Sequence, residues 1–96
     1  MASLTFNVVK NNLEGVAYRG DLNNVTTGGV YTVTMGDVTN YPYSATTGSM
    51  GNLIVIHTLY LTHQILLIGN TVVYMRRYIP GYNWSAWAQT TLTPET

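Results

Sequence analysis

Short segments in which apolar and polar residues alternate recur along the chain and predict β-strands. In residues 4–9 the apolar side chains stand at every second position, and in residues 30–35 the side chains of Tyr31, Val33 and Met35 share one face. This alternation is typical of strands with one buried face, because successive side chains of a strand point to opposite sides. No stretch of roughly twelve residues shows the helical period of about 3.6 residues.

Two apolar segments in the middle of the chain predict the centre of a sheet. Residues 53–59 are mostly β-branched and aliphatic, which is typical of a strand covered on both faces, and residues 63–68 resemble them. Gly69 and Asn70 separate this second segment from residues 71–74. We expect a hairpin there, because glycine accepts the positive φ at the first position of a type II′ turn.

Turn-forming residues divide the rest of the chain. Pro80 and Gly81 predict a turn before a last strand over residues 84–92, and the many breakers in residues 36–52 predict a long loop. Asp21 is placed to cap one short helical turn over residues 22–25. The sequence therefore predicts a mainly β fold: a small, single-domain antiparallel β-sheet or sandwich with long loops and at most one short helical turn.

Charge is scarce and balanced in these 96 residues. Charged residues make up 8% of the chain, with four basic and four acidic side chains. Lys and Arg are not concentrated in any stretch, so we expect no binding to a nucleic-acid backbone. A net charge of zero also removes the repulsion between copies, which favours an oligomer.

The apolar runs and the lack of cysteine exclude further classes. The longest apolar runs, residues 53–56 and 65–68, are far shorter than the roughly 18 residues of a membrane span, so no membrane insertion is expected. The chain contains no cysteine, which excludes disulfides and thiolate metal sites.

Short motifs follow one another in a specific order over about residues 21–89. They are Asp21-Leu22-Asn23, Thr27-Gly28-x-Val30-Tyr31, Asn40-x-Pro42, Gly51-x-Leu53-x-Val55, Gln64, Val73-Tyr74-x-Arg76 and Trp84-x-x-Trp87. In this order they resemble the pyocin-knob family of phage tail-fibre and R-type pyocin domains. The resemblance implies a knob domain over residues 21–93. Residues 1–20 would then be an N-terminal strand or connector, such as a shaft end, and residues 94–96 a C-terminal tail.

The resemblance also implies a function and a location. It points to a non-catalytic module of a homotrimeric fibre, which contacts other fibre segments and a bacterial surface polysaccharide or lipopolysaccharide. The expected location is the virion tail fibre or an extracellular particle, made in the bacterial host cytoplasm. Two alternatives stay open: a purely structural trimerisation or capping domain, and a carbohydrate-binding module of a polysaccharide-active enzyme.

Aromatic and amide side chains are the candidate glycan-binding residues. Aromatic rings can stack on the C–H faces of sugars, and amides can hydrogen-bond to hydroxyl groups. The candidates are Tyr41, Tyr43, Tyr78, Tyr82, Asn83 and Trp84. The opposite interpretation is that Trp84 and Trp87 belong to the core, and the loop at residues 40–52 is either a recognition loop or a subunit contact.

Catalytic and metal-binding patterns are not found in the sequence. None of the four acids has a nearby histidine or a nucleophile motif; they are Glu14, Asp21, Asp37 and Glu95. His57 and His63 lack His-x-His spacing, so we expect no metal and no cofactor. Arg76 and Arg77 are adjacent and should face opposite sides of a strand. We expect one of them to be structural, bonded to backbone carbonyls or to Asp21.

Overall fold

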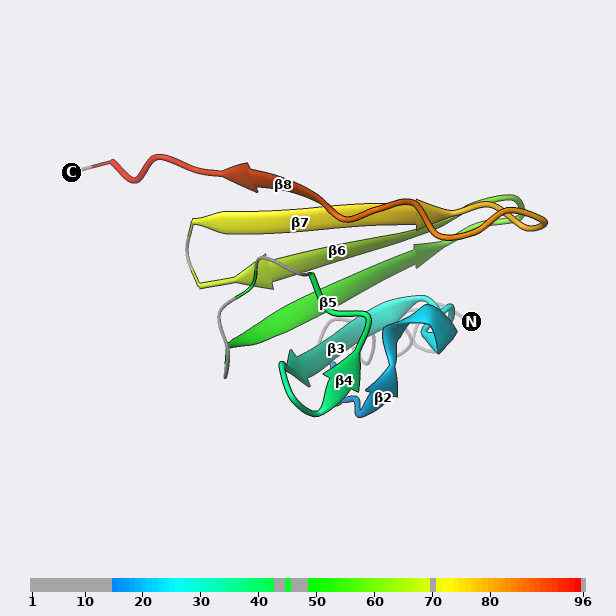
Figure 1. Ribbon diagram of the computed structural model, residues 1–96, viewed down its shortest axis with the longest axis horizontal. Coiled ribbons are helices and arrows are strands. Elements are labelled where there is room, and N and C mark those ends of the chain that lie inside the picture. Colours follow the sequence, from blue (N-terminus) through cyan, green and yellow to red (C-terminus); the bar gives the residue numbers. More distant parts are fainter. Residues whose placement is uncertain (1–14, 43–44, 46–48, 70, 96) are drawn as a thin grey trace, which may run out of the picture.

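The computed structural model describes residues 15–42, 45, 49–69 and 71–95 and consists mainly of β-strands (Figure 1). A six-stranded sheet has the order β1-β3-β5-β6-β7-β8, and β2 pairs with β4 in a second, small sheet. The strands are β1 Val16–Ala17, β2 Gly20–Asp21, β3 Gly29–Thr34, β4 Val38–Thr39, β5 Met50–His57, β6 Thr62–Ile68, β7 Val72–Tyr78 and β8 Ala88–Thr91. The predicted mainly β fold with at most one short helical turn is confirmed: the described residues contain a single 3-10 turn, η1, at Leu22–Asn24.

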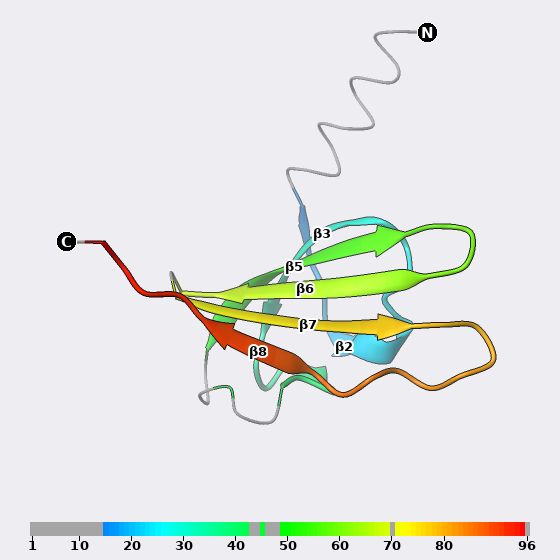
Figure 2. The ribbon, with the colours of Figure 1, turned by 90° about the horizontal axis from the view of Figure 1, so that it is seen from above.

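Strand directions are mixed. The neighbours from β3 to β8 in the large sheet pair antiparallel, as predicted, and the arrows of β5 to β8 alternate in direction in Figure 2. However, β1 runs parallel to β3, and β2 runs parallel to β4. The strands β1, β2 and β4 were not predicted, because strands of two residues are too short to show a period.

One face of the large sheet is covered, and we call it the inner face. In Figure 1, β2 and β4 lie in front of the β3 end of the sheet. Side chains in β5 alternate accordingly, since Leu53 and Val55 are buried whereas Ile56 is exposed. The expectation that residues 53–59 are covered on both faces is therefore wrong for the described chain, and the strand also ends at His57. The opposite, uncovered side is the outer face.

Several predicted boundaries hold where local turn chemistry sets them. Asp21 caps η1, and its side chain accepts a hydrogen bond from the Asn23 backbone N–H. The predicted hairpin is confirmed, and Gly69 has φ +62°, but Ile68 pairs with Val72, so three residues rather than the predicted two separate the strands. The predicted strand at residues 30–35 corresponds to β3. The predicted strand at residues 4–9 lies outside the described residues.

Two predictions were too coarse. The long loop predicted over residues 36–52 contains β4 and the first residues of β5. The last strand, predicted over residues 84–92, spans only Ala88–Thr91. Residues 83–87 instead form an irregular segment, held to β7 by a 2.9 Å bond from the Ser85 N–H to the Arg77 carbonyl. This segment leaves the strand path where its two tryptophans pack beside Arg76.

The hydrophobic core lies between the inner face and η1. Leu53, Leu66 and Tyr74 stand opposite one another on β5, β6 and β7, and Leu22 of η1 packs against the same cluster. Leu22, Leu53 and Leu66 are fully buried. Burial of a leucine side chain contributes roughly 1.5–3 kcal/mol. This cluster therefore holds η1 and the small sheet against the large one.

A buried glutamine joins the same two layers by hydrogen bonds. Gln64 on β6 is fully buried, and its Nε2 donates to the carbonyl oxygens of Leu22 at 2.7 Å and Val25 at 3.0 Å. Its Oε1 accepts a 2.9 Å bond from Nε of Arg76 on β7. The amide thus pairs with the Val25 carbonyl at the end of η1 and adds a second bond to the Leu22 carbonyl, which also accepts the Val25 N–H at 3.2 Å. Loss of the amide would remove the described partner of the Val25 carbonyl.

Replacing this amide by an aliphatic side chain of similar size should destabilise the protein. Gln64→Leu leaves the Val25 carbonyl and the Arg76 Nε–H without their described partner and removes one of the two bonds to the Leu22 carbonyl, so we expect a loss of about 3–5 kcal/mol in the free energy of unfolding. Denaturant titration measures this loss. Asn83→Leu is the control, because Asn83 is an exposed amide in a turn, and it should change stability by less than about 0.5 kcal/mol. Equal stability of the Gln64 variant and the wild type would contradict this account.

Candidate functional site

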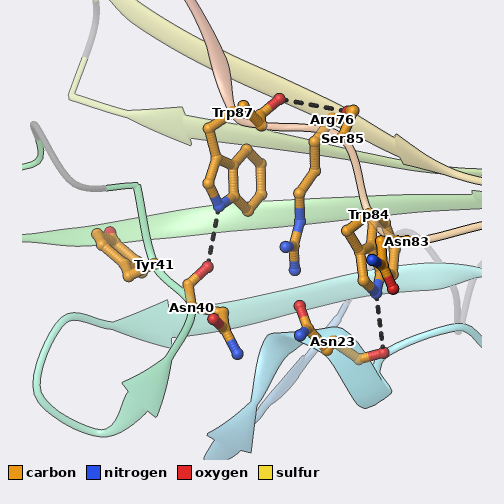
Figure 3. Close-up of a pocket in the computed structure, with 9 residues that line it drawn as sticks. Asn23, Asn40, Tyr41, Arg76, Asn83, Trp84, Ser85 and Trp87 are labelled. Atoms are coloured by element: carbon orange, nitrogen blue, oxygen red, sulfur yellow. Dashed lines mark hydrogen bonds between the residues drawn. The ribbon is translucent and has the colours of Figure 1, made fainter.

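The guanidinium of Arg76 lies between two indole rings on the inner face. Its Cζ is 4.1 Å from the ring centroid of Trp84 and 4.5 Å from that of Trp87 (Figure 3). A cation over an aromatic face is attracted by the ring quadrupole, and the attraction strengthens when water is excluded. Arg76 is only 6% exposed. This arrangement fixes the spacing of the two tryptophans.

The expectations for the two arginines are met in part. Arg76 is buried on the inner face and Arg77 is exposed, so they do face opposite sides. Arg76 is the structural one, but the hydrogen bond described for it goes to the Gln64 side chain rather than to a backbone carbonyl or to Asp21. Burial lowers the pKa of Arg76 to about 10, and the charge of Asp21 partly offsets this. The guanidinium therefore stays charged at neutral pH.

Each tryptophan is anchored at its nitrogen. Nε1 of Trp87 donates to the Asn40 carbonyl at 2.9 Å, and Nε1 of Trp84 donates to the Asn23 carbonyl at 3.3 Å (Figure 3). Trp84 also packs on Tyr78, with ring centroids 5.3 Å apart. Both indoles are partly buried. They belong partly to the scaffold and still border open space.

Asn40 holds the opposite wall of the site in an unusual backbone conformation. Its φ is +62°, in the left-handed region that asparagine tolerates better than most residues. Its Nδ2 donates to Asp21 Oδ1 at 2.7 Å, and the Asn23 N–H donates to the same oxygen at 2.8 Å. These two bonds, with that from Asn40 first, lower the pKa of Asp21. Asp21 is thus the anchor of the loop.

Together these elements enclose an open depression of about 560 Å³. Trp84 and Trp87 line it from one side, and Arg76 reaches into it between them (Figure 3). Tyr41 lines the other side, where its hydroxyl lies 3.4 Å from Ser49 Oγ and burial raises its pKa. Amides are the commonest polar groups in the lining; they come from Asn23, Asn40 and Asn83.

Two buried polar atoms of the lining residues have unused hydrogen-bonding capacity. Nη2 of Arg76 is a donor and Oδ1 of Asn23 is an acceptor, and neither has a partner among the described residues. Figure 3 shows both side chains directed into the same space. Buried polar groups are nearly always paired in native proteins. A hydroxyl group, which donates and accepts, could pair with both.

The structure gathers some of the predicted glycan-binding residues and separates others. Tyr41, Asn83 and Trp84 line the depression. Tyr78 lies behind Trp84, and Tyr82 stands 72% exposed near the β7–β8 turn, outside the lining. Tyr43 lies outside the described residues.

Six lining residues are not among the predicted glycan-binding residues: Asn23, Asn40, Arg76, Ser85, Ala86 and Trp87. Four of them, Asn23, Asn40, Arg76 and Trp87, occur in the short motifs that carry the family resemblance. Their convergence depends on pairing between segments up to 61 residues apart. Spacing along the chain could not reveal it.

The histidines do not come together. His57 and His63 lie on neighbouring strands, but their register places them on opposite faces of the sheet. His57 Nδ1 is 2.8 Å from Thr62 Oγ1. Within the described part of the chain, no three His, Cys, Asp or Glu side chains are grouped as metal ligands would be. The same part holds no helix long and apolar enough to cross a membrane.

No protein-family model matches the chain, and no curated protein or solved structure matches it either. The resemblance to the pyocin-knob family stays a prediction.

Low pH should weaken the attachment of Asn40 to Asp21, because protonation of the Asp21 carboxylate weakens its hydrogen bond from Asn40. The folded state lowers the pKa of Asp21 below its usual 3.8. Its carboxylate therefore stabilises the fold above about pH 4, and this contribution is lost as pH falls through the lowered pKa. Asp21→Asn keeps the acceptor but does not titrate. Melting curves from about pH 7 to pH 2 should fall less steeply for this variant than for the wild type. Parallel curves would show that Asp21 carries no such contribution.

Proposed function

We propose that this chain is a non-catalytic fibre module, carried in several copies, that binds a bacterial surface glycan in the depression beside Arg76. The observation that supports it is a pair of atoms in the same lining, Arg76 Nη2 and Asn23 Oδ1, that have no hydrogen-bond partner in the described part of the chain. A sugar hydroxyl satisfies a donor and an acceptor at once. The proposal places the chain in a virion tail fibre or a tail-like bacteriocin fibre, in line with the motif resemblance.

The rest of the lining suits a sugar as well. The indoles of Trp84 and Trp87 offer apolar surface to the C–H groups of a sugar ring, and each is held in place at its nitrogen. Asn83 is exposed at the rim, where its amide is free to meet a hydroxyl. Anchored side chains lose little conformational entropy on binding. An open site still gives a modest affinity, which several copies on one fibre would multiply.

Tryptophan fluorescence offers a direct test, because both tryptophans of the chain line the depression. The probes are delipidated lipopolysaccharide O-chains and capsular polysaccharides from a panel of bacteria. We expect at least one of them to shift the emission in a saturable way. Asn83→Ala should weaken that binding about tenfold without changing the melting temperature, since one hydrogen bond is lost.

Tyr82→Ala is the matched control, because Tyr82 neighbours Asn83 in sequence but does not line the depression. It should bind as the wild type does. Loss of binding in Tyr82→Ala with full binding in Asn83→Ala would move the site to the β7–β8 turn. If no polysaccharide of the panel shifts the emission or blocks adsorption of the protein to cells, a purely structural role would be favoured.

A further inference from the structure

The outer face of the large sheet carries a continuous apolar row, flanked by Thr32, Asn52 and Thr90, and no described element covers it. In the strand register, one row crosses five strands: Val30, Ile54, Ile65, Met75 and Ala88. Beside this row lie Ile56 and Leu67. Met75 and Ile56 are each 47% exposed, and Leu67 is 37% exposed. Monomeric proteins rarely leave a continuous apolar patch of this kind open to water.

Charge is nearly absent from the outer face. Among the described strand positions, its single charged side chain is Arg77, which stands at the rim opposite His63. The whole chain has a formal net charge of zero. Charged residues are depleted at the centres of protein interfaces, and neutral surfaces of like sequence do not repel each other. The face therefore suits a partner with the same neutral, apolar character.

The size of the face is adequate for a stable contact. Five strands about 4.8 Å apart, with roughly five residues each at 3.3 Å, span about 400 Å² of plane. Side chains that project from this plane add to its area, so packing two such faces removes roughly 1,000 Å² or more of accessible surface. This area reaches the range of specific interfaces. Sheets that stack in this way lie about 10 Å apart.

The sequence of β5 points to the same conclusion. Residues Leu53, Ile54, Val55 and Ile56 form a continuous apolar run, which is typical of a strand buried on both faces. Among the described residues, the side of Leu53 and Val55 is buried, whereas Ile54 is half-buried and Ile56 is exposed. The face of a second copy offers the same apolar row and would cover the Ile54 and Ile56 side.

We propose that the outer face is the surface through which copies of this chain pack against one another, sheet against sheet. A two-fold pair and a three-sided prism both place the row of one copy against that of another. The row can pack against its own copy, because the side chains that it presents are apolar on all five strands. This inference names the contact that would bring several copies of the proposed glycan site together, but it depends on different residues.

Sedimentation equilibrium of the full chain, with lysine substitutions, tests it. Met75→Lys and Ile56→Lys alter side chains that are half exposed, so both variants should fold; circular dichroism and tryptophan emission verify this. We expect a wild-type dimer or trimer and a dissociation constant raised roughly 100-fold in each variant, because a charge must be buried at the contact. Leu59→Lys is the control, since Leu59 is 81% exposed in the β5–β6 turn, away from this face.

Three results would overturn the inference: a wild-type chain that stays monomeric at millimolar concentration, folded lysine variants that associate as tightly as the wild type, or dissociation by Leu59→Lys alone. Its failure is separable from that of the glycan site. A monomer that still binds polysaccharide would contradict the proposed interface but not the glycan site. An oligomer that binds no polysaccharide would contradict the glycan site but not the interface.

Discussion

The fold depends on one constraint: the buried amide of Gln64 must find partners for both its ends. It does so across two layers, donating to the carbonyls of Leu22 and Val25 and accepting from Arg76. A half-satisfied buried network costs more than an apolar core. These bonds therefore fix how η1 sits on the sheet and where the guanidinium points. The direction of the guanidinium in turn sets the positions of both tryptophans, which pack on either side of it.

The two faces of the large sheet then have different chemistry. On the inner face, the polar side chains of Gln64 and Arg76 are buried and bonded to each other, and Arg76 borders the depression. On the outer face, an apolar row crosses the sheet with almost no charge. Both faces come from the same strands, because successive side chains of a strand point to opposite sides. Gln64 and Ile65, for example, are neighbours in sequence but lie on opposite faces. The proposed glycan site and the proposed contact between copies thus share strands without sharing side chains.

Features set by neighbouring residues could be predicted from the sequence. The strand at residues 30–35, the Asp21 cap and the hairpin at Gly69 each follow from local propensity. Features set by distant pairing could not. The irregular segment at residues 83–87 exists because its tryptophans meet Arg76 and carbonyls of Asn23 and Asn40. The site was therefore predicted only in part: Tyr41, Asn83 and Trp84 were identified, but the other six lining residues were not.

The side-chain Nε–H of Arg76 reports most directly on this constraint, and nitrogen-15 NMR can measure it. The account predicts a proton that exchanges slowly with water, because it is buried and bonded to Gln64. Its arginine side-chain signals should also shift upfield, because the guanidinium lies over two indole rings. Arg19 and Arg77 are exposed and serve as internal references. Exchange of the Arg76 proton as fast as theirs, without an upfield shift, would contradict the account.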